Sequence, residues 1–281
     1  MLPSALFHGA PLLGYPGFVA VTVFSRRSAQ LSLPVSQESI PMRDQRGHLA
    51  DIPVRVVHED THAGERGTIL FYHGFSADID GQTKELTSLA EAGYLVIGVD
   101  AVGHGVRRYD DFDARYGGEG DEAEHGFLEL VRASAAEIPR LIDTLVESGL
   151  ARTDRIGLGG ISMGGYIAYR AVCLEPRLKV VAPILGSPRW DVVHPDSPHL
   201  HPDRFFPTAL LSQNASLDEA VPPEAARGFH RDLATLYAEA PERLAYVEHR
   251  ECGHFMPEPR WIELWDQVLR WFGRFMPGPE V

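Results

Sequence analysis

The segment Gly160-Ile161-Ser162-Met163-Gly164 places a serine between two glycines, at a point where a strand pattern gives way to a helix pattern. In that context a tight turn holds the serine in a strained conformation and exposes its hydroxyl, while the glycines let the helix approach the strand. A serine hydroxyl is a weak nucleophile, so it needs a base and an acid that orients the base. We therefore predict that Ser162 is the nucleophile of an acyl-transfer reaction.

Two loops farther along the chain offer the acid and the base. Asp218 opens the run Asp218-Glu219-Ala220-Val221-Pro222 after one expected strand, and His254 closes Cys252-Gly253-His254 after the next. Loops at the ends of neighbouring strands bring such side chains to one edge of a sheet. We predict that Asp218 orients His254 and that His254 takes the proton from Ser162. The rivals that stay open are Glu219 and Asp191 for the acid and His249 for the base.

An acyl-transfer site also needs donors for the negative oxygen of the tetrahedral intermediate. The run His73-Gly74-Phe75-Ser76 ends an expected strand, so a backbone N–H there can point into the site. Met163 lies at the start of a helix, where backbone N–H groups favour an anion. We predict that the amides of Phe75 and Met163 form the oxyanion hole and that His73 is structural.

The elements that must position these residues follow from the spacing of apolar side chains. Residues 67–72 form a continuous apolar run, which is typical of a strand buried on both faces, and apolar residues recur every three or four positions along 121–147, which indicates a helix. Buried strands alternating with helices predict an α/β fold: a mostly parallel, doubly wound sheet flanked by helices. The expected strands are 51–58, 67–72, 94–100, 155–161, 179–184, 208–212 and 244–249, and the expected helices are 81–91, 121–147, 163–174, 223–240 and 261–275.

We expect one catalytic domain over residues 37–281, with a short lid at about 187–206 where no regular pattern occurs. Residues 1–36 are expected to form an N-terminal arm. Their apolar stretch is not preceded by lysine or arginine and is interrupted by proline and glycine, which argues against an export signal. A signal, an anchor or an artefact of start-site choice stays open for this arm.

Composition excludes several classes of function. The chain of 281 residues has a formal net charge of −13, which disfavours binding to nucleic acid, and no apolar run long enough to span a membrane. Two cysteines suit a reducing compartment, and we expect a cytoplasmic protein. We expect no metal and no organic cofactor, since the one histidine-rich stretch lacks the spacing of zinc ligands. That stretch contains His194, Asp196, His199, His201 and Asp203.

From about residue 40 onward, the chain resembles the α/β-hydrolase superfamily, and most of all its small bacterial esterases, dienelactone-hydrolase-like members and prolyl-oligopeptidase-like hydrolases. The run from Asp100 to Arg107 (DAVGHGVR) is similar to the D-x-x-G-H-G-x-[RS] loop of that superfamily. The resemblance also rests on HGF at 73–75, GISMG at 160–164, D-x-x-V-P at 218–222 and G-H at 253–254, which occur in the superfamily's order.

The sequence thus predicts a serine hydrolase that cleaves carboxylic esters. The small lid, together with the resemblance, implies short or medium acyl chains. The expected partner is a small-molecule ester, and a homodimer stays open. Three alternatives also stay open: a peptidase or amidase, a thioesterase or lysophospholipase on the same residues, and a ligand-binding protein that keeps the fold without catalysis.

Overall fold

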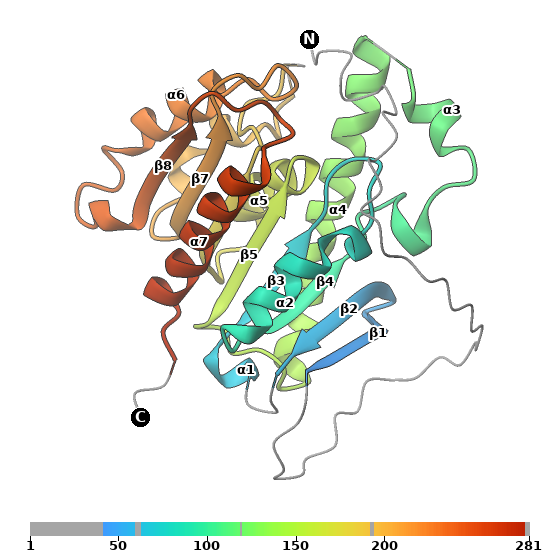
Figure 1. Ribbon diagram of the computed structural model, residues 1–281, viewed down its shortest axis with the longest axis vertical. Coiled ribbons are helices and arrows are strands. Elements are labelled where there is room, and N and C mark those ends of the chain that lie inside the picture. The colour runs from blue at the N-terminus through green and yellow to red at the C-terminus, as the bar shows by residue number, and fades with distance from the viewer. Residues whose placement is uncertain (1–41, 60–62, 119, 192–193, 279–281) are drawn as a thin grey trace.

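A single eight-stranded sheet forms the centre of the computed structural model, which describes residues 42–59, 63–118, 120–191 and 194–278. Its strand order is β1-β2-β4-β3-β5-β6-β7-β8; β2 runs antiparallel to both neighbours, and all pairs from β4 to β8 are parallel. The predicted fold class is therefore confirmed (Figure 1). The strands are β1 (Arg43–Leu49), β2 (Ile52–His58), β3 (Thr68–Tyr72), β4 (Leu95–Val99), β5 (Ile156–Ile161), β6 (Leu178–Ile184), β7 (Ala209–Ala215) and β8 (Leu244–His249).

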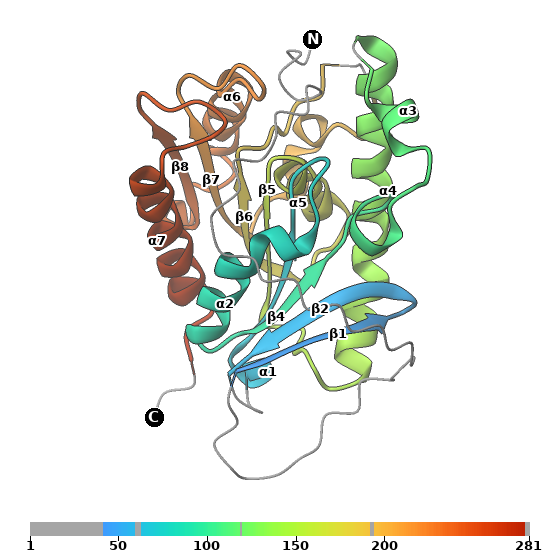
Figure 2. The ribbon, with the colours of Figure 1, turned by 45° about the vertical axis from the view of Figure 1, so that its right-hand side comes forward.

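Helices cover both faces of the sheet because its central strands are apolar on both faces. In β3, Leu70 and Tyr72 face one apolar layer, and Ile69 and Phe71 face the other. The first layer is covered by α4, α5 and α6, and the second by α2 and α7. In Figure 2, α2 and α7 lie to the left of the sheet and α4 to its right. The helices are α1 (Ala63–Arg66), α2 (Thr83–Glu91), α3 (Phe112–Tyr116), α4 (Asp121–Glu147), α5 (Met163–Leu174), α6 (Glu224–Leu233) and α7 (Glu258–Phe275).

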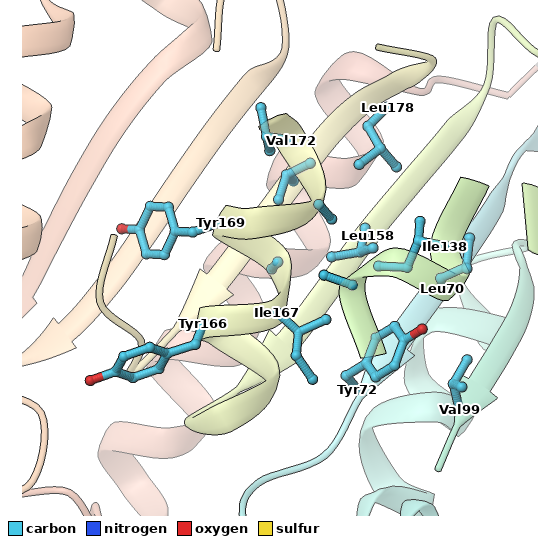
Figure 3. Packing of buried hydrophobic residues seen from close by; sticks show 14 of the residues in the cluster. Leu70, Tyr72, Val99, Ile138, Leu158, Tyr166, Ile167, Tyr169, Val172 and Leu178 are labelled. Atoms are coloured by element: carbon cyan, nitrogen blue, oxygen red, sulfur yellow. The ribbon is translucent and has the colours of Figure 1, made fainter. Parts of the chain in front are cut away.

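The first layer holds α5 in place at the centre of the molecule. Figure 3 shows Leu158 of β5, Ile138 of α4 and Ile167 of α5 meeting there, while Tyr166 points to the other side of α5. Leu158, Ile138 and Ile167 are fully buried. Dense packing of this kind leaves little freedom for the turn that joins β5 to α5.

Most expected elements are present, and the differences have local causes. The strand β1 and the short helix α3 were not predicted, because β1 is a polar edge strand and α3 lies in an acidic, glycine-bearing stretch. The helix expected over 223–240 ends at Leu233. Beyond it the chain turns back, and the Tyr237 hydroxyl lies 2.7 Å from the Phe205 carbonyl oxygen and 2.6 Å from that of Thr208.

The segment expected to be a lid packs firmly against the domain in its described part, 187–191 and 194–206. Its Asp196 carboxylate accepts hydrogen bonds from Arg132 of α4, at 2.9 Å, and Arg170 of α5, at 2.7 Å. Phe205 is fully buried in the first layer. In the structure this segment is thus bonded to α4 and α5 through Asp196, and its role as a lid stays a prediction.

The expected N-terminal arm, residues 1–36, lies outside the described residues, so both the arm and the domain boundary at residue 37 stay predictions. Within the described ranges, none of the helices combines the length and the apolar character needed to cross a membrane.

The apolar face of α7 allows a direct test of the second layer. Leu264 is fully buried, whereas Ile262, two residues earlier, has 62% of its surface exposed. Leu264→Ala should lower the free energy of unfolding by about 2–5 kcal/mol, because it leaves a cavity in a packed layer. The matched control Ile262→Ala should change it by about 0.5 kcal/mol or less. Urea denaturation followed by circular dichroism measures both, and equal losses in the two variants would contradict the assignment of α7 to this layer.

A network of buried polar side chains joins α5, β7 and α6. The Tyr169 hydroxyl donates to Ser212 Oγ at 2.6 Å, and His230 Nε2 lies 2.7 Å from the same oxygen. Burial lowers the pKa of His230 to about 3, so the folded protein keeps this imidazole neutral under mildly acidic conditions.

This network predicts an acid-sensitive contribution to stability. The unfolded chain protonates His230 below its ordinary pKa of 6.5, while the folded protein resists protonation until about pH 3. Stability should therefore fall as the pH drops from 6.5, by about 2 kcal/mol at pH 5 from this residue. His230→Asn should lose less stability between pH 7.5 and pH 5 than the wild type in urea denaturation. His125→Asn, at an exposed position, should behave as the wild type; an unchanged pH dependence in His230→Asn would refute the prediction.

Candidate active site

Ser162 sits alone between the last residue of β5 and the first residue of α5. Its backbone has φ = +56° and ψ = −113°, a conformation that residues with a β-carbon rarely adopt. The Ser162 amide donates to the carbonyl oxygen of Ile184 at 2.8 Å, which ties the turn to the end of β6. The strained turn predicted from the glycine-flanked serine is therefore present.

Two glycines make this turn sterically feasible. A β-carbon at Gly164 would collide with the Tyr72 carbonyl oxygen, and one at Gly160 would collide with the backbone of Gly164. The first turn of α5 thus packs directly on the ends of β3 and β5. Larger residues at these two positions would push the helix away and move Ser162 with it.

The structure brings Ser162, His254 and Asp218 into one hydrogen-bonded chain. His254 Nε2 lies 3.0 Å from Ser162 Oγ, and His254 Nδ1 lies 2.8 Å from Asp218 Oδ2. The His254 side chain is 11% exposed and that of Asp218 is fully buried. In this arrangement Nδ1 donates to the carboxylate and Nε2 accepts from the serine, which is the tautomer that a general base requires.

Backbone amides fix the orientation of the Asp218 carboxylate. Its Oδ1 accepts hydrogen bonds from the amides of Ala220, at 3.0 Å, and Val221, at 2.8 Å. Its Oδ2 is left to face the imidazole of His254. The D-x-x-V-P pattern therefore encodes a local turn in which one carboxylate oxygen binds the backbone and the other binds the histidine.

The loops that carry Asp218 and His254 are joined to each other. The Ser216 amide donates to the His249 carbonyl oxygen at 2.9 Å, and the Leu217 amide donates to the Cys252 carbonyl oxygen at 2.8 Å. The Glu251 amide donates to Ser216 Oγ at 3.0 Å. These bonds continue the pairing of β7 and β8 beyond the ends of the strands, so they set the distance between Asp218 and His254.

The rival residues occupy other places. Glu219 is exposed, and Asp191 is exposed on the wall of a cavity that is also lined by Pro222. His249 Nε2 lies 3.0 Å from Gln213 Oε1 in the body of the sheet. Only Asp218, among these candidate acids, is paired with the imidazole that faces Ser162.

The two amides predicted to form the oxyanion hole belong to residues close to the serine in the fold or in the chain. Gly74 packs against it, since a β-carbon at Gly74 would lie 3.6 Å from Ser162 Cβ, and Phe75 follows directly. Met163 follows Ser162 as the first residue of α5. The ring of Phe75 is held among those of His104, Phe112 and Phe127, with centroids 5.5–5.6 Å apart. The role of both amides stays a prediction.

The loop from Asp100 to Arg107 supports the Phe75 segment, a role that pattern reading did not identify. His104 Nε2 accepts a hydrogen bond from the Ser76 amide at 3.1 Å, and burial lowers the pKa of His104 to about 4. The imidazole is therefore a neutral acceptor near neutral pH. Asp100 accepts from the Ile79 amide through Oδ1, at 2.9 Å, and from the Val106 amide through Oδ2, at 3.0 Å.

His73 is structural, in keeping with its predicted role. Its Nε2 accepts a hydrogen bond from the Ala101 amide at 3.0 Å, and its Nδ1 lies 2.7 Å from the Gly74 carbonyl oxygen. Burial lowers the pKa of His73, which keeps the ring neutral. The ring thus joins the end of β3 to the end of β4.

A cavity of about 280 Å³ is lined by residues that follow Ser162 and Asp218 in the chain. Its wall includes Tyr166, whose amide donates to the Ser162 carbonyl oxygen at 3.1 Å, and Pro222, four residues after Asp218. Other parts of the wall come from the first turns of α4 and α6 and from residues 187–191.

The histidine-rich stretch uses its ring nitrogens locally. His194 Nδ1 accepts from the Asp196 amide at 3.0 Å, His199 Nδ1 lies 2.8 Å from Ser197 Oγ, and His201 Nε2 lies 2.7 Å from the Pro195 carbonyl oxygen. Across residues 42–59, 63–118, 120–191 and 194–278, the structure holds no group of three or more histidine, cysteine, aspartate or glutamate side chains that could bind a metal ion.

Known proteins that resemble this chain include two that are described as esterases and a solved structure with a similar fold. A Bacillus subtilis protein described as "Putative esterase YitV" is 23% identical over 252 residues, which cover 79% of this chain and 94% of that protein. The Escherichia coli protein "Esterase YjfP" is 29% identical over 143 residues, about half of each chain (50% and 53%). The solved structure of TT1662 from Thermus thermophilus superimposes with a TM-score of 0.70 at 19% identity, covering 85% of this chain and all (100%) of that one.

A match to a family model shows the family to which this chain belongs. The model described as "Serine aminopeptidase, S33" matches residues 63–268, which contain β3 to β8 and all three residues of the hydrogen-bonded chain. The match covers well over half of the sequence, and the observed fold is that of the α/β-hydrolase superfamily. This chain therefore belongs to the serine aminopeptidase S33 family of α/β-hydrolases.

Proposed function

We propose that this hydrolase cleaves carboxylic esters of short to medium acyl chains through an acyl-enzyme on Ser162. The observation that carries the proposal is the unbroken chain from Ser162 Oγ through His254 to Asp218, with steps of 3.0 and 2.8 Å. Two relatives whose names describe esterases support the choice of an ester as substrate.

In the proposed reaction, Ser162 Oγ attacks the ester carbonyl carbon while its proton passes to His254 Nε2. Asp218 stabilises the imidazolium that forms, and the amides of Phe75 and Met163 donate to the oxyanion. The C–O bond to the alcohol then breaks, and His254 returns the proton to the leaving alkoxide. Water repeats these steps in the second half-reaction, releasing the acid and regenerating Ser162.

The preference for short or medium acyl chains is supported by the size of the adjoining cavity. Its volume of about 280 Å³ is slightly below the usual range for small-molecule sites, which run from about 300 to 1,000 Å³. Residues of the segment 187–191 line the space on one side. A long acyl chain would have to lie outside this space.

A peptidase or amidase is the second candidate, because the family is described as a serine aminopeptidase. Both reactions use the same nucleophile and base, so the substrates decide between them. Hydrolysis of p-nitrophenyl esters of increasing chain length should exceed hydrolysis of aminoacyl-nitroanilides in kcat/KM. The reverse order would favour the peptidase.

Substitution of the nucleophile tests the covalent mechanism. Ser162→Ala should lower kcat for a short p-nitrophenyl ester by about 10³-fold or more, because the remaining site can only activate water. It should also abolish labelling by a fluorophosphonate probe while leaving the circular dichroism spectrum unchanged. Ser148→Ala, at the exposed end of α4, serves as the control and should keep full activity. A folded and active Ser162→Ala protein would refute the acyl-enzyme, and an unlabelled wild type would favour a ligand-binding protein.

Substitution of the acid tests the role of Asp218. Asp218→Asn keeps the shape but favours the wrong imidazole tautomer, so kcat should fall by up to about 10⁴-fold with a smaller change in KM. Glu219→Gln and Asp191→Asn should each stay within about tenfold of the wild type on the same short-chain ester, since neither side chain orients His254. If Asp218→Asn is nearly as active as the wild type while either control loses activity, the acid has been assigned to the wrong residue.

A further inference from the structure

Two exposed apolar residues are the neighbours of the acid and the base in the chain. Phe255 follows His254, and Leu217 precedes Asp218. Phe255 has 82% of its surface exposed, more than any other large apolar residue that the structure describes, and Leu217 has 64% exposed. We propose that Phe255 binds the alcohol part of the ester, so that the preferred substrate is the ester of an apolar, ring-bearing alcohol. This inference rests on the proposed ester hydrolysis and names the class of alcohol.

The loop that carries Phe255 is anchored by other residues. Cys252 is buried in the second apolar layer, and Met256 packs against that layer. The Leu217 amide donates to the Cys252 carbonyl oxygen at 2.8 Å, which fixes the loop after β7 to the loop after β8. The main chain around Phe255 is therefore held while its ring faces water. The apolar surface of that ring adds little to folding and is open to a bound molecule.

The ring of Phe255 lies close to the imidazole of His254. Their centroids are 5.6 Å apart, and the two ring planes are nearly perpendicular, at 87°. A single apolar side chain on a protein surface is ordinary and indicates no function by itself. The contact with the imidazole of the hydrogen-bonded chain is what points to a role for this ring in the reaction.

The chemistry of His254 indicates which part of the substrate comes to this ring. In the proposed reaction His254 Nε2 returns a proton to the oxygen of the leaving alcohol, so that oxygen must come within about 2.6–3.2 Å of Nε2. The acyl carbon is instead bonded to Ser162 Oγ. Of the two halves of the ester, the alcohol is therefore the one that must contact the imidazole on which Phe255 packs.

The chemistry of Phe255 indicates the kind of alcohol. Its side chain offers neither charge nor hydrogen bond, so it favours a partner without polar groups, and contact between the two removes apolar surface of both from water. Aromatic rings gain further from edge-to-face or offset contact. Benzyl alcohol meets these requirements, whereas methanol would leave the ring of Phe255 exposed. Because the alcohol leaves before water attacks, this contact assists formation of the acyl-enzyme and not its hydrolysis.

Three small esters test the proposal. Benzyl acetate and methyl phenylacetate are isomers that carry the same ring on the alcohol side or on the acyl side, and methyl acetate has no ring. We expect the wild type to cleave benzyl acetate with a kcat/KM about tenfold or more above that of methyl acetate, a difference of about 1.4 kcal/mol. Phe255→Ala should reduce this preference to about threefold or less, because the contact is lost. It should leave the ratio between methyl phenylacetate and methyl acetate as in the wild type.

Matched variants and a second readout accompany this experiment. Ile262→Ala removes an apolar side chain that is 62% exposed on α7 and should keep the wild-type preference for benzyl acetate. Phe255→Leu keeps an apolar side chain and should retain more of the preference than Phe255→Ala. Benzyl acetate and methyl acetate give the same acetyl-enzyme, so the effect of Phe255→Ala should be confined to its formation. A residue that only positions His254 would slow formation and hydrolysis alike.

The outcomes separate this proposal from the proposed function. If the wild type cleaves benzyl acetate no faster than methyl acetate, the alcohol site is overturned although ester hydrolysis stands. A preference that survives in Phe255→Ala, or an equal loss with all three esters, overturns it too. If the wild type cleaves none of the esters, the proposed function fails, and titration of Ser162→Ala followed by NMR decides. Tighter binding of benzyl acetate than of methyl phenylacetate, lost when Phe255→Ala is added, supports the site, and equal binding overturns it.

Discussion

The close approach of α5 to the ends of β3 and β5 is the constraint on which the rest of the site depends. Gly164 packs against the carbonyl oxygen of Tyr72, and Gly160 packs against the backbone of Gly164. The dense layer beneath α5 holds the helix in this position. The strained φ of +56° at Ser162 follows from that packing, and the serine hydroxyl is presented where the loops after β3, β7 and β8 can reach it.

Around this turn the protein uses neutral, buried histidines as hydrogen-bond acceptors. His73 and His104 each accept a backbone amide, and together they join the ends of β3 and β4 to the loop that carries Phe75. Burial lowers the pKa of both, so that near neutral pH neither ring adds charge next to the Phe75 segment. The imidazole of His254 differs because it faces a carboxylate on one side and a hydroxyl on the other.

Features that are encoded within a few neighbouring residues could be predicted from the sequence. The glycines around Ser162, the turn at Asp218 and the apolar period of α4 each describe a local conformation, and the structure contains all three. The pairing of Ser162 with His254 and Asp218 was also predicted, because each lies in a recognisable local motif, whereas distant contacts without such a motif could not be predicted. The hydrogen bond between His104 and Ser76 joins residues 28 positions apart, and the cavity is shaped by four separate segments. The polar edge strand β1 gives no apolar signal, since it is recognised only by its pairing with β2.

The bonds between the loops after β7 and β8 have a mechanical consequence. Ser216 and Leu217 are bonded to His249 and Cys252, so the loops that carry Asp218 and His254 are tied to each other. Ser162 lies on a different part of the fold, between β5 and α5. Any displacement of the two joined loops relative to β5 and α5 would therefore carry Asp218 and His254 together. It would change the distance between His254 Nε2 and Ser162 Oγ more than the distance between His254 Nδ1 and Asp218 Oδ2.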